Sequence, residues 1–126
     1  MKPHGELTIQ TLAMPADTNP NGDIFGGWIV SQMDLAAGIL AKRTAQGRVV
    51  TVSIHSMSFL KPVHVGDVVS CYVDLVKRGN TSMTIAVEVW AQCASSAVTY
   101  RVTKGDFVYV AIDDVGNPRK LPDTKE

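Results

Sequence analysis

Asp34 is the side chain in this sequence best placed to do chemistry, because it is a charge within an apolar stretch. Between Ile24 and Ala41 no other residue is ionisable. A carboxylate held away from water is a stronger base than the same group at the surface. The structural alternative is a carboxylate satisfied by backbone amides or paired with a distant lysine or arginine. The residue alone does not decide between the two.

Two glycines, Gly26 and Gly27, stand about two helical turns before Asp34. A glycine pair at a helix start leaves backbone N–H groups uncovered, and these point along the positive end of the helix dipole. Such groups can stabilise the oxyanion that develops during acyl transfer. An oxyanion hole and a carboxylate on one helix therefore favour the catalytic interpretation. The HExxH, GxSxG and phosphate-cradling glycine patterns of zinc, serine and nucleotide hydrolases do not occur in the sequence.

Histidines and cations are the remaining candidates. Of the three histidines, only His55 lies in a predicted strand from which it could face a groove, and a strand histidine is more often packed or solvated than catalytic. Basic residues near a groove mouth suit the phosphates of a polyanionic ligand. Those considered are Arg48, Lys61, Lys77 and Arg78. For each of them alone, a solvated surface charge is the simpler interpretation.

One helix must position the glycines and the carboxylate. Turn-forming residues at 19–22 lead into an apolar segment whose spacing predicts a helix over about 27–43. One face carries Ile29, Met33, Ala36, Ala37 and Leu40, and the opposite face carries Trp28, Leu35 and Ile39. Because the segment is apolar almost all round, we expect the helix to be buried.

Strands make up the rest of the predicted structure. Alternation and turn residues place them at 6–13, 49–60, 68–76, 82–92 and 98–112, with a bulge or bend at Gly105. An apolar helix followed by a run of antiparallel strands predicts a sheet wrapped around the helix. The fold class is therefore α+β. A single domain is expected over residues 1–126, with 1–6 and 119–126 as flexible termini.

Composition excludes several classes of function. Twelve basic and twelve acidic residues cancel, which argues against a general nucleic-acid or acidic-membrane binder. The first seven residues are polar and mixed, unlike a signal peptide, and polar residues interrupt the helix, so no membrane span is expected. Cys71 and Cys93 have no CxxC spacing and are interpreted as reduced thiols. These features predict a cytoplasmic protein.

Two stretches carry a resemblance to a known family. They read TLAMPADTNPNGDIFGGWIVSQMD (residues 11–34) and GRVVTVSIHSMSFLKPVHVGDVV (residues 47–69). Both closely resemble the bacterial YciA-like acyl-CoA thioesterases of the hot-dog fold, and the likeness runs from Leu7 to about Pro122. The resemblance implies a single hot-dog domain and hydrolysis of acyl-CoA to free CoA and a carboxylic acid. It implies no metal and no cofactor, since CoA is part of the substrate.

The resemblance also implies roles for particular residues. Asp34 matches the catalytic carboxylate, acting as general base or as nucleophile, and Gly26 with Gly27 matches the backbone N–H that polarises the thioester carbonyl. Asn19 matches a polar residue placed opposite the carboxylate across a dimer interface. The expected substrate-binding residues are Arg48, Thr51, Ser53, Ser58, Lys61 and Arg78. Ser58 stands where many relatives carry Asn and His55 where many carry an acid, so substrate preference is not inherited.

The expected partners are the acyl-CoA substrate and further copies of the same chain, with neither nucleic acid nor membrane. The resemblance implies a homodimer, assembled further into a trimer of dimers or a tetramer. Two other functions stay open. A hot-dog hydratase or dehydratase acting on 3-hydroxyacyl thioesters pairs a histidine with an acid, and only His55 could serve. A non-catalytic acyl-CoA sensor would need no carboxylate on the helix.

Overall fold

The structure is a computed structural model that describes residues 2–124. Its elements are β1 (Glu6–Leu12), a short 3-10 helix (Pro15–Asp17), α1 (Gly26–Ala45), β2 (Val49–Phe59), β3 (Val68–Arg78), β4 (Ser82–Gln92) and β5 (Thr99–Ala111). The predicted helix and the strands are confirmed, and each end lies within two residues of its expected position. Local periodicity was therefore enough to locate every major element.

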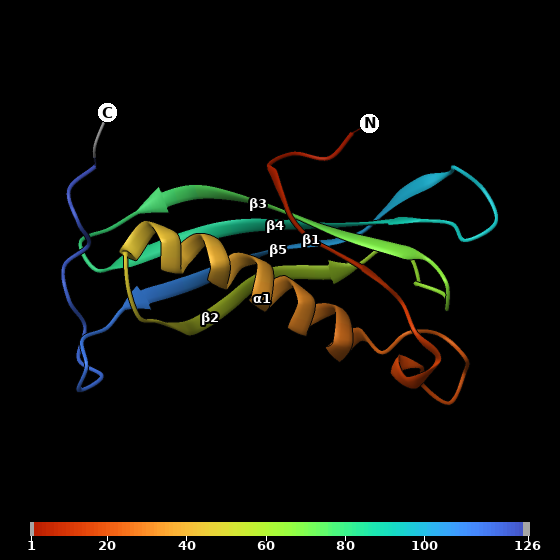
Figure 1. Cartoon of the computed structure of the whole chain (residues 1–126), viewed down its shortest axis with the longest axis horizontal. Helices are drawn as coiled ribbons and strands as arrows, with labels where there is room; N and C mark the ends of the chain where they lie inside the picture. The colour runs from red at the N-terminus through yellow and green to blue at the C-terminus, as the bar shows by residue number, and fades with distance from the viewer. Residues whose placement is uncertain (1, 125–126) are drawn as a thin grey trace.

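The strands form one antiparallel sheet in the order β1-β3-β4-β5-β2, and α1 lies across one face of it (Figure 1). Alternate residues of the central strands point at the helix and are fully buried, including Val69, Cys71, Met83, Ile85, Val87 and Phe107. Met33 and the small residues Ala36, Ala37 and Ala41 of α1 meet them, also with no exposure. Small residues on this face of α1 let the helix approach the sheet closely. The predicted α+β hot-dog fold is confirmed.

The helix is buried on one side only, which corrects the expectation of burial all round. Leu35 is 58% exposed and Ile39 is 46% exposed, because the sheet of this chain covers only the opposite face. The edge strand β2 likewise exposes Val50, Val52 and Ile54. The apolar pattern of the helix therefore exceeds what one chain can bury.

The irregularity predicted at Gly105 lies on the neighbouring strand. The β2–β5 register shifts between His55 and Ser58, and Ser56 adopts a positive φ of 56°. Gly105 stands opposite this bulge, where an added Cβ would lie 3.0 Å from Met57 Cε. The glycine therefore makes room for a bulge in β2 rather than forming one itself.

Within residues 2–124, no helix is long and apolar enough to cross a membrane.

Candidate active site

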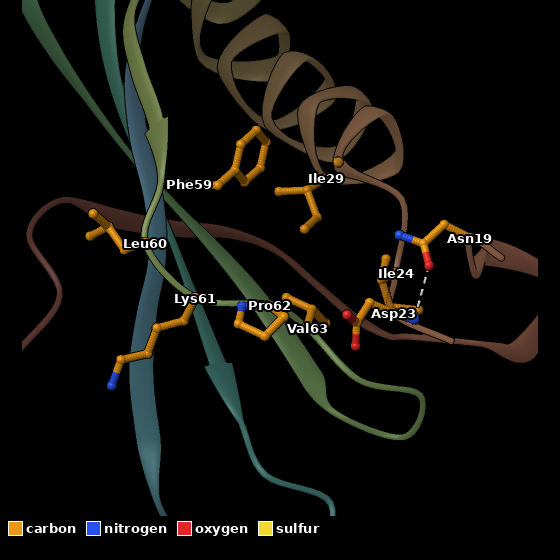
Figure 2. Close-up of a pocket in the computed structure, with 10 residues that line it drawn as sticks. Asn19, Asp23, Ile24, Ile29, Phe59, Leu60, Lys61, Pro62 and Val63 are labelled. Carbon is orange, nitrogen blue, oxygen red and sulfur yellow. Dashed lines mark hydrogen bonds between the residues drawn. The ribbon is translucent and has the colours of Figure 1, made fainter. Parts of the chain in front are cut away.

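The loop before α1 is held together by Asn19. Its side-chain Oδ1 accepts hydrogen bonds from the backbone N–H of Asn21 at 2.9 Å and of Asp23 at 3.1 Å. The backbone N–H of Asn19 donates to the Asp23 carbonyl in return. The carbonyl end of the Asn19 side chain is therefore used by the loop. Its amide nitrogen has no partner among the described residues, and Figure 2 shows it on the side that faces the pocket.

The first turn of α1 has free N–H groups, as the glycine pair predicted. Phe25 occupies the N-cap position and makes no side-chain capping bond. Outside the helix itself, the N–H groups of Gly26 and Gly27 find no partner within the described part of the chain. A Cβ added at Gly27 would meet nothing within 4 Å. Two unpaired N–H groups at the positive end of a helix can donate hydrogen bonds to a substrate oxygen and so stabilise the negative charge that develops on it.

A cavity of about 310 Å³ lies against this helix start. The loop and helix contribute Asn19, Asp23, Ile24, Gly26 and Ile29. The opposite wall comes from Phe59, the last residue of β2, and from the four residues that follow it, Leu60, Lys61, Pro62 and Val63. Figure 2 shows Phe59 and Ile29 directed at each other, while Leu60 and Lys61 point away from the helix. The structure thus brings together three predicted residues, Asn19, Gly26 and Lys61.

Asp34 sits further along the same helix and is half-buried. Its Oδ1 accepts hydrogen bonds from Thr51 Oγ1 at 2.8 Å and from the Tyr109 hydroxyl, which also lies 2.8 Å from the Asp34 backbone carbonyl. Its Oδ2 has no partner among residues 2–124, and no ion pair involves it there. One carboxylate oxygen is therefore fixed by two hydroxyl donors and the other is left available.

Tyr109 is the residue that sequence reasoning missed. Burial, followed by its hydrogen bond to Asp34, holds the pKa of the Tyr109 hydroxyl well above its usual range. The hydroxyl therefore remains protonated near neutral pH and serves as a donor. Thr51, expected among the substrate-binding residues, also bonds to Asp34. The available signal was the inward position of a tyrosine in β5, because a buried tyrosine hydroxyl needs a partner.

Within one chain, Asp34 is far from the cavity at the helix start. It follows Gly26 by eight residues, which corresponds to about 12 Å along the helix axis. Asp34 is not among the residues that line the cavity. A single chain therefore places Asn19 and Gly26 together and keeps Asp34 apart from them.

The other predicted residues are dispersed. Arg48 donates to the backbone carbonyls of Asp113 and Asp114 at 3.3 and 3.0 Å, and Arg78 ends β3, both remote from Gly26 in this chain. Ser53 Oγ lies 2.8 Å from His55 Nε2 on β2, and Ser58 is exposed near the end of the same strand. Across the described residues, no group of three His, Cys, Asp or Glu side chains could hold a metal ion.

Comparison with known proteins shows the family of the chain. Residues 21–97 match the thioesterase superfamily. The acyl-CoA thioester hydrolase YciA of Salmonella typhimurium is 58% identical over 123 residues, which span 95% of this chain and 92% of that protein. A hexameric thioesterase from Yersinia pestis is 58% identical with a TM-score of 0.94, covering 98% of this chain and all of that one. A hexameric hot-dog thioesterase from Campylobacter jejuni is 43% identical, with a TM-score of 0.89, covering 94% and 91% of the two chains.

The two solved structures correct the expected assembly. A homodimer assembled further into a trimer of dimers or a tetramer was expected, whereas both relatives are hexamers, which contradicts the dimer and the tetramer as end states. The exposed apolar faces of α1 and β2 fit a chain that contacts further copies of itself. With the fold, the free helix N–H groups and the sequence identity in agreement, the chain belongs to the thioesterase superfamily, among its YciA-like hot-dog members.

Proposed function

We propose that this protein hydrolyses acyl-CoA thioesters to free CoA and a carboxylic acid, with Asp34 as the catalytic carboxylate. The observation that carries the assignment is the state of Asp34: Oδ1 is held by Thr51 and Tyr109, and Oδ2 is free. A carboxylate oriented through one oxygen presents the other in a fixed direction, as a base or nucleophile requires. The YciA relative acts on acyl-CoA, which supports the same substrate class here.

The site uses the helix start of one chain and the carboxylate of another. The thioester carbonyl oxygen would accept hydrogen bonds from the N–H groups of Gly26 and Gly27, and the Asn19 amide would orient the carbonyl or the attacking water. Because about 12 Å along the helix separates Gly26 from Asp34 in one chain, a second copy supplies the carboxylate. Hexameric relatives make such copies available, and we propose a hexamer here too.

Two chemical routes use the same atoms. In the first, Asp34 Oδ2 takes a proton from water while the water oxygen bonds to the thioester carbon. In the second, Oδ2 itself bonds to that carbon, and water then cleaves the resulting anhydride. In both, the tetrahedral oxyanion forms at the glycine N–H groups, and its collapse breaks the carbon–sulfur bond and releases the CoA thiolate, which takes up a proton.

Neither alternative function has a comparable observation. A hydratase or dehydratase would need His55 beside an acid, but His55 is exposed and bonds to Ser53. A sensor would have no use for a carboxylate oriented by two hydroxyl donors. The oriented oxygen of Asp34 therefore favours hydrolysis.

Thiol release from a panel of acyl-CoAs of increasing chain length tests the function, with Asp34→Asn beside the wild type. The variant keeps a carbonyl oxygen for Thr51 and Tyr109 but lacks the base, so kcat should fall about 100-fold or more with an unchanged melting temperature. Near-normal turnover by Asp34→Asn would show that the catalytic assignment is wrong. The absence of thiol release by the wild type across the panel would reject the function itself.

A further inference from the structure

The loop that leads into α1 contains the only asparagine in this sequence that is followed by glycine. Asparagine is chemically labile, because the backbone nitrogen of the next residue can attack its side-chain amide. Asn19 and Asn117 precede proline, whose nitrogen has no hydrogen to lose. Asn80 precedes Thr81, whose branched side chain hinders the attack. Asn21 precedes a glycine, which has no side chain, so its amide is the one most open to attack.

The structure leaves this Asn-Gly pair open to water. Asn21 and Gly22 are both exposed, and the side-chain amide of Asn21 has no hydrogen-bond partner among residues 2–124. A Cβ added at Gly22 would meet nothing within 4 Å, so the space beside it is open. The Gly22 N–H donates to the Asn19 carbonyl at 3.0 Å. Because this bond closes a turn at the surface, a local opening frees the nitrogen without unfolding the domain.

We propose that Asn21 and Gly22 form a site of spontaneous modification, at which Asn21 converts to isoaspartate and the enzyme is thereby inactivated. The Gly22 nitrogen bonds to Cγ of Asn21 and loses its proton, and the side-chain nitrogen departs as ammonia, which leaves a cyclic succinimide. Water then opens the ring. Attack at Cγ gives aspartate, whereas attack at the original backbone carbonyl carbon gives isoaspartate, in which the main chain runs through Cβ and Cγ. The loss of activity rests on the proposed function, but the modification itself does not.

Isoaspartate adds an atom to the main chain between two N–H groups that share one acceptor. Asn19 Oδ1 accepts hydrogen bonds from the N–H of Asn21 at 2.9 Å and of Asp23 at 3.1 Å, and Figure 2 shows the second of these bonds. The Asn19 N–H donates to the Asp23 carbonyl at 2.6 Å. Since a longer chain between residues 21 and 23 moves the two donors apart, Asn19 Oδ1 loses at least one of them. The modification therefore releases the Asn19 amide, which the proposed function places on the thioester carbonyl or the attacking water.

Prolonged incubation of the folded wild type at pH 8, followed by peptide mapping with mass spectrometry, tests the modification without any turnover. Asn21 should convert to aspartate and isoaspartate, while Asn80 of the same chain stays unchanged as the internal control. Asn21→Gln places the amide on a longer side chain that closes a ring more slowly, so this variant should stay unmodified. Asn21 has no positive φ, so the loop accepts glutamine. Conversion of Asn80 as fast as Asn21 would overturn the proposal. So would an unchanged Asn21 in the folded protein when the chain unfolded in guanidinium chloride converts.

Thiol release from acyl-CoA, measured on the same samples, tests the consequence. Activity of the incubated wild type should fall in proportion to its isoaspartate content with an unchanged circular dichroism spectrum, while incubated Asn21→Gln keeps its activity. Fresh Asn21→Asp carries the added negative charge on a backbone of normal length, so it should be as active as the wild type. Isoaspartate that accumulates without loss of activity, or an inactive fresh Asn21→Asp, would overturn the proposal. A wild type that is modified at Asn21 but hydrolyses no thioester even when fresh would reject the proposed function and keep the modification site.

Discussion

Tyr109→Phe is the change that most sharply tests how Asp34 is prepared for catalysis. The substitution keeps the ring, which is 2% exposed and packed in the core, and removes only the hydroxyl that donates to Asp34 Oδ1. A hydrogen bond to a charged group contributes about 1.5–3 kcal/mol. If that stabilisation serves the reaction, kcat/KM should fall by about 10- to 100-fold. Thr51 still donates to the same oxygen, so we expect the lower part of this range.

The separate kinetic constants distinguish a donor role from a packing role. The Tyr109 hydroxyl holds Asp34 Oδ1, and Tyr109 does not line the cavity at the helix start. Tyr109→Phe should therefore lower kcat and leave KM for acyl-CoA unchanged.

Thiol release measured over a range of acyl-CoA concentrations provides the assay, and Tyr72→Phe is the matched control. Tyr72 lies on β3, and its hydroxyl has no hydrogen-bond partner among the described residues, so its removal should leave both constants unchanged. A Tyr109→Phe protein with the kcat of the wild type would refute the donor role. It would reduce Tyr109 to a packing residue.

Two further predictions concern the thiols and the exposed helix face. Cys71 is fully buried and the pKa of its thiol is raised to about 12, whereas Cys93 is half-buried. An aromatic disulfide reagent at pH 8 should therefore react with one thiol per chain in the folded protein and with two after unfolding. Rapid reaction of both thiols in the folded protein would contradict this. Leu35→Asp on the exposed face should lower the mass of the oligomer measured by light scattering and leave the circular dichroism spectrum unchanged. Met33→Asp on the buried face should instead unfold the chain. A Leu35→Asp protein of unchanged mass would show that this face is not a subunit contact.

The sequence was most informative where the relevant contacts are local. Alternation of apolar and polar residues located β2 to β5. The glycine pair identified the helix start, and Asp34, eight residues after Gly26, was identified as a lone charge in an apolar stretch. The contact with Tyr109 joins residues 75 positions apart, and no local pattern encodes which inward strand residue meets which helix turn.

The surroundings of the charged side chains were the hardest property to predict from the sequence. Arg48 and Lys61 both carry a positive charge, yet Arg48 donates to the backbone carbonyls of Asp113 and Asp114, while Lys61 lines the cavity at the helix start. The exposed apolar residues Leu35 and Ile39 show a related limit. An apolar pattern predicts that a face is covered, but it does not say whether the cover comes from the same chain or from another copy.

Complementation between two inactive variants tests the central claim, a site shared between chains. Asn19→Asp keeps the acceptor oxygens that hold the loop but removes the amide donor, and Asp34→Asn removes the catalytic carboxylate. Each protein alone should be nearly inactive. When the two are unfolded and refolded together in equal amounts, each site draws one residue from each of two chains, so about a quarter of the sites should be intact. Recovery of about a quarter of wild-type thiol release is the predicted result. A mixture no more active than its components would contradict a shared site.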